Sequence, residues 1–176
     1  MKKVMLILAF TFLSLALPAQ RKSVCLGGFF SPRACGVTLV FPRDRSFSDL
    51  RLSADLGGVI RGETAIPGVR AEWQYNYILS RWEVPDGTHI LLYAGPGAML
   101  GYVYDGSNGR GVAAALNAAV GGGFRFPGSP VLVTVGFSGS VGCHLTMTDS
   151  HDSRMTLYKT GLRNFLTPEI SLRYDF

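Results

Sequence analysis

The chain ends on a regular alternation of apolar and polar residues. Every second position from Leu166 to Phe176 is apolar or aromatic, and every position between them is polar or charged. The apolar positions are Leu166, Pro168, Ile170, Leu172, Tyr174 and Phe176. Successive side chains of a β-strand point to opposite faces, so this pattern predicts a strand whose two faces meet different environments.

The same period of two recurs upstream, in the segments 49–56, 69–79 and 131–142. Four further segments carry weaker strand patterns, namely 24–30, 36–41, 88–104 and 111–126. Because the alternation is sustained over most of the chain and is separated by turn-like residues, it predicts an all-β protein.

Two of the weaker segments need interpretation. The segment 111–126 is rich in alanine, which suits a helix, but three consecutive glycines at Gly121–Gly123 would weaken a helix, and we predict a strand. In the segment 88–104, Pro96 has no N–H to donate to a neighbouring strand, so we expect a β-bulge there.

The connectors predict an up-and-down order of eight strands. Short turn-like stretches cover 31–33, 42–46, 80–87 and 127–130, whereas 57–68 and 104–111 are more open and polar. The stretch 148–164 is either the longest connector or the tip of a hairpin that extends past the main body. Eight antiparallel strands close naturally into a barrel, which leaves no exposed sheet edge. No repeat or linker divides the chain, so we expect one barrel domain.

The N-terminal residues have the features of an export signal. Lys2 and Lys3 precede an apolar run at 4–17, and the small residue Ala19 permits cleavage. We therefore predict a signal peptide at residues 1–19 and a mature domain at residues 20–176. The alternative is an N-terminal membrane anchor, but the apolar run is shorter than the ~20 residues that a spanning helix needs.

Charge and cysteine content exclude several classes of function. Removal of Lys2 and Lys3 would lower the formal charge from +5 to about +3, and no run of basic residues follows. This argues against a nucleic-acid partner. The three cysteines, Cys25, Cys35 and Cys143, match no metal-binding spacing. We interpret them as small apolar residues, leave open whether two of them pair, and expect no metal, cofactor or catalytic residues.

Alternation alone does not say which face of the barrel points inward. The polar faces carry charges of both signs, and the mature chain has only two lysines, Lys22 and Lys159, which is unusual for a water-exposed surface. Ten large rings on the apolar faces would hardly fit inside eight strands, whose lumen barely holds its own side chains. Both points favour an apolar exterior and a network of charges in the lumen. The predicted lumen residues are Asp49, Arg51, Asp55, Arg70, Glu72, Arg125, Glu169 and Arg173.

The terminal pattern Ile170-x-Leu172-x-Tyr174-x-Phe176 resembles the C-terminal signal of Gram-negative outer-membrane β-barrel proteins. Small barrels of the OmpA/OmpX kind are similar to this chain in their export signal, eight strands and aromatic last residue. The resemblance implies an eight-stranded antiparallel transmembrane β-barrel in the outer membrane. It further implies contact with outer-membrane lipid and recognition of the last strand by the barrel-assembly machinery. Pro168 and the glycine-rich middle strands depart from the pattern and leave strand lengths open.

Several functions are compatible with such a barrel. We predict a non-enzymatic protein with a filled lumen, whose loops serve a surface or envelope partner. Alternatives are a lipid A deacylase-like enzyme, a secreted lipocalin-like carrier, or a barrel subunit of a secretion or conjugation machine. The enzyme hypothesis depends on the segment Ser150-His151-Asp152-Ser153, with Glu169 downstream. In it His151 would be the base and Ser153 the nucleophile, because a base must lie within hydrogen-bond reach of its nucleophile. Polar turns often contain these residue types, so the segment is weak evidence for catalysis. We expect His144 to be a lumen residue and not a catalytic base.

Overall fold

The computed structural model describes residues 24–147, 153–163 and 166–176. The predicted signal peptide, residues 1–19, lies outside this part of the chain. Among the described residues, no helix is long and apolar enough to cross a bilayer.

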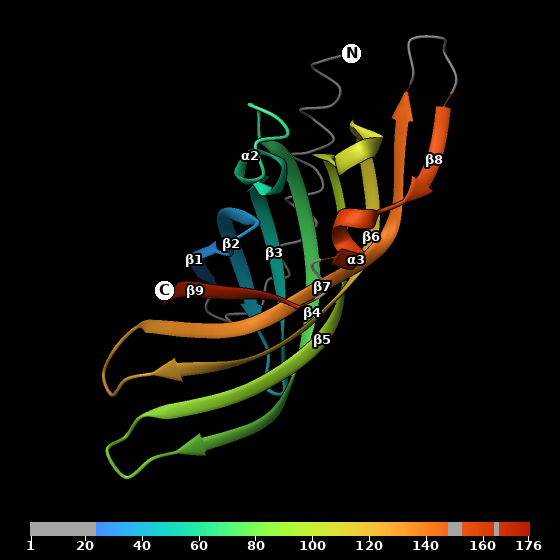
Figure 1. Ribbon diagram of the computed structural model, residues 1–176. Helices are drawn as coiled ribbons and strands as arrows, with labels where there is room; N and C mark the ends of the chain where they lie inside the picture. Colours follow the sequence, from blue (N-terminus) through green and yellow to red (C-terminus); the bar gives the residue numbers. More distant parts are fainter. Residues whose placement is uncertain (1–23, 148–152, 164–165) are drawn as a thin grey trace, which may run out of the picture.

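The described chain is a curved antiparallel sheet that closes on itself (Figure 1). Eight strands form the ring in the order β1-β2-β3-β4-β5-β6-β7-β9, and β9 returns to pair with β1. The prediction of an all-β, closed, eight-stranded antiparallel barrel is therefore confirmed. The strands are β1 (Cys25–Phe30), β2 (Ala34–Pro42), β3 (Ser46–Asp55), β4 (Gly68–Glu83), β5 (His89–Tyr104), β6 (Arg110–Arg125), β7 (Val131–Met147), β8 (Ser153–Leu157) and β9 (Thr167–Asp175).

The two ends of the barrel differ. We call the end with the tight turns 43–45, 84–88 and 126–130 the turn end; Asp175 also lies there, donating its N–H to Pro130 O. The opposite end, which we call the loop end, carries the short helices α2 (Gly57–Ile60) and η1 (Gly106–Asn108). In Figure 1 the β4–β5 and β6–β7 hairpins extend well past the other strands at the turn end.

The eighth strand of the ring is divided. Its first part, β8, pairs with the loop-end half of β7 in a hairpin, and its second part, β9, pairs with the turn-end half of β7 and with β1. Between them the chain forms the short helix α3 (Lys159–Arg163). The pairing of β7 with β8 agrees with the hairpin alternative for 148–164, whereas the interruption of the strand by α3 was not predicted.

The bulge expected at Pro96 is not there. Pro96 pairs with Ala118 of β6 in register, and the register toward β4 is the same on both sides of Pro96. Register instead shifts between Ile78 and Ser80 of β4. A Cβ added to Gly95 would overlap the carbonyl oxygen of Tyr75, so the backbones of β4 and β5 approach closely beside Pro96.

The prediction of a strand in 111–126 is confirmed by β6, and a buried tyrosine explains its glycines. Tyr93 is 1% exposed and packs edge-on against Phe47, with ring centroids 5.2 Å apart. A Cβ on Gly121 would lie 2.6 Å from Tyr93 Oη, and one on Gly136 would lie 3.3 Å away. The glycines that argue against a helix therefore make room for a large side chain on the facing strand.

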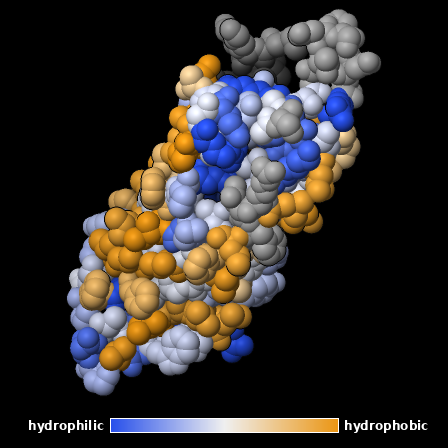
Figure 2. Space-filling model, in the orientation of Figure 1, coloured by the Kyte–Doolittle hydropathy of each residue, from blue (hydrophilic) through white to orange (hydrophobic). Residues whose placement is uncertain are grey.

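In this barrel the polar side chains of the strands are buried and the apolar side chains are exposed, which is the reverse of a water-soluble barrel. Leu116 is 74% exposed and Leu172 56%, whereas Asp49 is 0% and Arg51 2% exposed. Apolar side chains spread over the outer surface of the strands, and polar side chains gather toward the end that carries α2 (Figure 2). The strands thus present their apolar face outward and their polar face to the lumen.

Candidate functional site

A compact cluster of charges occupies the lumen between β3 and β9. Arg51 binds Glu169 through two parallel hydrogen bonds, Nη1 to Oε2 at 2.9 Å and Nη2 to Oε1 at 3.0 Å. The same guanidinium donates through Nε to Asp49 Oδ2 at 2.9 Å, and Arg173 Nη2 reaches that oxygen at 3.1 Å. Asp49 and Arg51 share a face because they are two residues apart on one strand. We call these four residues the lower cluster.

Neutral side chains complete the lower cluster. Thr38 donates its hydroxyl to Asp49. Arg173 Nε donates to Ser171 Oγ at 3.2 Å, and the hydroxyls of Ser171 and Thr134 are 2.5 Å apart. The Arg51 guanidinium also lies 5.0 Å from the centroid of the Phe29 ring. Two arginines and two carboxylates balance in formal charge, and buried ions of this kind are tolerated when they are paired and hydrogen-bonded.

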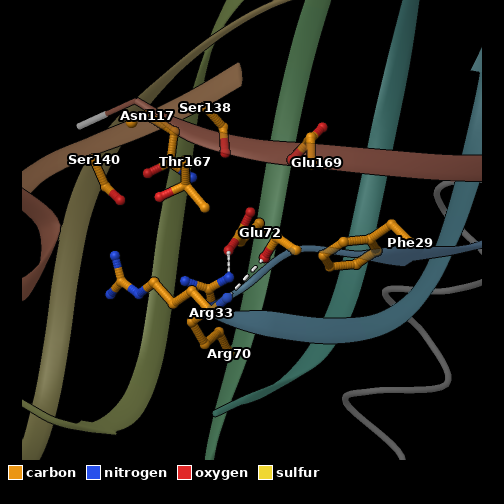
Figure 3. Close-up of a pocket in the computed structure, with 11 residues that line it drawn as sticks. Phe29, Arg33, Arg70, Glu72, Asn117, Ser138, Ser140, Thr167 and Glu169 are labelled. Carbon is orange, nitrogen blue, oxygen red and sulfur yellow. Dashed lines mark hydrogen bonds and ion pairs between the residues drawn. The ribbon is translucent and has the colours of Figure 1, made fainter. Parts of the chain in front are cut away.

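A second cluster lies closer to the loop end. Arg70 Nη2 approaches Glu72 Oε1 at 3.0 Å, while Asp55 Oδ2 lies 3.6 Å from Arg70 Nη1 and 3.5 Å from Arg33 Nε. The two contacts of Asp55 are longer than those of the lower cluster, and Arg33 Nη2 has no hydrogen-bond partner among the described residues. We call Arg33, Asp55, Arg70 and Glu72 the upper cluster; Figure 3 shows Arg33, Arg70 and Glu72.

Arg33 is the member of this cluster that the sequence analysis missed. It lies in the turn between β1 and β2, where the alternation that identifies inward positions does not apply. The structure nevertheless buries it, at 6% exposure, with its guanidinium 5.1 Å from the centroid of the Tyr158 ring. Only the closing of the barrel places this turn over the lumen.

A small polar cavity lies beside the upper cluster (Figure 3). Its volume is about 20 Å³, and its walls include Asn117, Ser138, Ser140 and Thr167. A cavity of roughly this size holds about one water molecule. Glu169 also lines the cavity, so the cavity borders both clusters.

Arg125 is the predicted lumen residue that lies apart from both clusters. It sits at the turn end, where its Nη2 is 3.1 Å from Asp175 Oδ2. The two side chains are 35% and 24% exposed, so this pair borders the mouth of the barrel and does not fill its interior. The structure therefore divides the predicted network into two buried clusters and one pair at the rim.

The helix α3 is held from across the lumen by Asp105. Its carboxylate accepts hydrogen bonds from the backbone N–H groups of Lys159, at 3.2 Å, and Thr160, at 2.7 Å, and from Asn108 Nδ2 at 2.9 Å. These N–H groups start a helix and have no intrahelical partner. Burial raises the pKa of Asp105, but the hydrogen bonds from Thr160 and Asn108 lower it by more, so its pKa lies below the ordinary value.

Tyr158 fixes the start of α3 against the barrel wall. Its N–H donates to Gly142 O on β7, and its ring, fully buried, stacks on His144 with centroids 6.4 Å apart. His144 is itself 0% exposed and so faces the interior. On the other side, Arg33 Nη1 lies 3.5 Å from Thr160 O. The segment 158–160 thus links β7 to the β1–β2 turn where the eighth strand is interrupted.

The four residues of the terminal signal point outward from β9. Ile170, Leu172, Tyr174 and Phe176 are 46%, 56%, 47% and 74% exposed. The rings of Tyr174 and Phe176 pack edge-on with centroids 4.9 Å apart. Because β9 pairs with both β1 and β7, these side chains form part of the apolar outer surface at the seam of the barrel.

The residues considered for catalysis are not brought together in the described part of the chain. Ser150, His151 and Asp152 lie outside the described residues, and Glu169 is bound to Arg51. Cys25, Cys35 and Cys143 are unpaired. The described residues contain no group of three or more side chains that could hold a metal ion.

The described residues of the site fill the lumen with balanced charge and hold α3 in the wall. Comparisons of the chain with protein-family models, with curated proteins and with solved structures found no match.

Proposed function

We propose that the chain is a non-enzymatic integral outer-membrane protein of a Gram-negative bacterium. Its barrel spans the membrane, its turn end faces the periplasm and its loop end faces outward. The observation that carries the proposal is the reversed polarity of the barrel, with exposed residues such as Leu116 and Leu172 outside and the ion pairs of Arg51 inside. Transmembrane barrels have an apolar outer band and a polar interior for this reason.

A secreted lipocalin-like carrier is a poor fit to the same observation. Such a carrier binds its ligand in an apolar lumen and turns its polar face to water. Here Asp49, Arg51 and Glu169 are at most 7% exposed, while the exposed apolar side chains extend around the ring. A monomer in water rarely exposes a continuous apolar surface of this extent.

The terminal strand supports assembly in the outer membrane. Its outward residues Ile170, Leu172, Tyr174 and Phe176 lie on the strand that closes the ring against β1. We propose that the barrel-assembly machinery reads this strand and that its aromatic end then lies at the lipid boundary. The loops and short helices of the loop end are the surface available to an envelope or surface partner.

The proposal is tested by fractionating expressing cells and running the purified protein on gels with and without boiling. We expect the protein in the outer membrane, and we expect its migration to change on heating, because a closed barrel resists detergent until it is boiled. A mature chain that stays monomeric and folded in detergent-free buffer would contradict the proposal and favour the carrier.

A further inference from the structure

A larger cavity opens at the turn end of the barrel. Its volume is about 570 Å³, within the range of ~300–1,000 Å³ that is usual for small-molecule pockets. All eight strands of the ring contribute to its walls, so it is the mouth of the lumen and not a groove on the surface. We call it the turn-end cavity.

The floor of the turn-end cavity is apolar. Val40, Phe47, Ile78 and Leu91 line it and belong to one hydrophobic cluster with the buried Tyr93. Arg173 of the lower cluster borders the cavity beside this floor, with its guanidinium over the Phe47 ring at 5.1 Å. An apolar floor facing an open mouth would be hydrated in water, and a hydrocarbon group lying on it would release that water.

The walls of the turn-end cavity carry more positive than negative charge. Arg43, Arg81, Arg125 and Arg173 line it, against Glu83 and Asp175. Arg173 is engaged by Asp49, and Arg125 by Asp175.

Two of these arginines remain free to meet an anion. Arg43 lies 5.9 Å from the Tyr75 ring centroid, and Arg81 Nη2 donates to the backbone oxygen of Asp44 at 2.7 Å. Within the described residues, no ion pair involves either of them. The bond to Asp44 also holds Arg81 beside the turn that carries Arg43, so the two cations border the same side of the mouth.

We propose that the turn-end cavity binds one small amphiphilic anion, with its single acyl chain on the Phe47–Leu91 floor and its carboxylate or phosphate at Arg43 and Arg81. The apolar floor supplies affinity for the chain, and the guanidinium groups supply preference for an anionic head. This placement rests on the proposed function: in the orientation given there, the turn end and this site face the periplasm.

Trp82 reports on binding because it lines the cavity, whereas Trp73, which is equally exposed at 51%, does not. The test places the Trp73→Phe protein in lipid nanodiscs and titrates it with brominated dodecanoate, a quencher of tryptophan fluorescence. We expect saturable quenching above the linear background that partitioning into the bilayer causes. Unbrominated dodecanoate or dodecyl phosphate should displace the quencher, and the better competitor identifies the headgroup.

Variants then separate the two halves of the site. Arg43→Gln with Arg81→Gln should weaken binding at least tenfold, and Leu91→Phe, which fills the floor without adding a second tryptophan, should abolish saturation. Arg61→Gln is the matched control: it removes a surface arginine at the opposite end, paired with Glu63 at 2.9 Å, and should leave binding unchanged.

Two results would overturn the inference: quenching that stays linear in the unaltered cavity, or dodecanol competing as well as dodecanoate. Each variant is also checked for its heat-dependent gel shift, so a misfolded protein is recognised. A protein that shifts on heating but binds no amphiphile refutes this site and leaves the proposed membrane barrel standing.

Discussion

At the scale of single residues, the lumen depends on how completely each buried charge is matched. Arg51 uses three nitrogens on two carboxylates, and every contact in that set is 3.0 Å or shorter. Arg33 and Arg70, by contrast, share Asp55 at 3.5 and 3.6 Å. The lower cluster is therefore the tighter of the two, and removal of one of its members leaves a partner charged and buried.

Arg51→Met tests that conclusion. It should lower the free energy of unfolding by about 3–5 kcal/mol, because Asp49 and Glu169 lose their shared cation in a buried site. Adding Glu169→Gln should restore part of the loss, since one uncompensated charge is then gone. The measurement is urea unfolding in bilayers, with the exposed Arg61→Met as control, expected to change stability by less than about 1 kcal/mol. A double variant as unstable as the sum of two independent losses would argue against coupling.

At the scale of elements, the eighth strand is the irregular part of the barrel. Only its second part, β9, has the alternating pattern of apolar and polar residues. The helix α3 is stabilised by the carboxylate of Asp105 in the β5–β6 connector and by the stacking of Tyr158 on His144. These contacts join segments that are distant in the sequence. The wall between β7 and the β1–β2 turn therefore depends on side chains as much as on strand pairing.

The contribution of Asp105 to α3 should depend on pH. Its folded-state pKa is lowered, so the ionised carboxylate stabilises the fold fully above the unfolded-state pKa of about 3.9, and this stabilisation is lost as the pH falls through the folded-state pKa. Asp105→Asn should be less stable than the unaltered protein near neutral pH, and the gap should narrow below about pH 4. If the difference in stability between this variant and the unaltered protein does not change on acidification, the charge of Asp105 does not contribute to the stability of the fold.

The outward face of β9 is tested by a matched pair of charges. Leu172 and Ile60 are similarly exposed, at 56% and 64%, but Leu172 lies on a strand and Ile60 in α2 at the loop end. Leu172→Arg should cost about 2–4 kcal/mol if β9 faces the middle of a bilayer, whereas Ile60→Arg should be nearly neutral. Unfolding in lipid vesicles measures the stability of both variants. If the two arginines change stability equally, the outer face of β9 does not contact lipid.

At the scale of the whole molecule, the barrel is a filled cylinder with one open mouth. An eight-stranded ring leaves room for little beyond its own side chains, and here two ion-pair clusters occupy that room. The turn-end cavity ends on the apolar floor around Phe47 and does not continue to the loop end. The described side chains therefore fill the lumen between the two ends of the barrel.

Planar-bilayer recording tests the filled lumen. The purified monomer should give no stable, reproducible channel, because a permeating ion would have to displace the paired arginines. The protein must first show its heat-dependent gel shift in the same preparation, which establishes that folded barrels were inserted. Large, uniform conductance steps would mean that the lumen opens in the membrane.

Much of this structure could be predicted from local pattern. The period of two located all eight strands of the ring, and the balance of charge on their polar faces indicated an ionic lumen. The predicted lumen residues Asp49, Arg51 and Glu169 do lie together, because the period of two places each of them on the inward face of its strand. The register shift was not predictable, because it lies between Ile78 and Ser80 of β4, where neither a proline nor a glycine marks it in the sequence.

By itself the sequence determined the strands, their number and which side chains share a face, since these follow from the geometry of an extended chain. Only the tertiary structure decided which distant residues meet. The burial of Arg33 and the turn-end cavity arise when β9 closes on β1, and Asp105 holds α3, which interrupts the eighth strand, across 55 positions of the chain. Closure brings together residues more than a hundred positions apart, and no local period encodes such contacts.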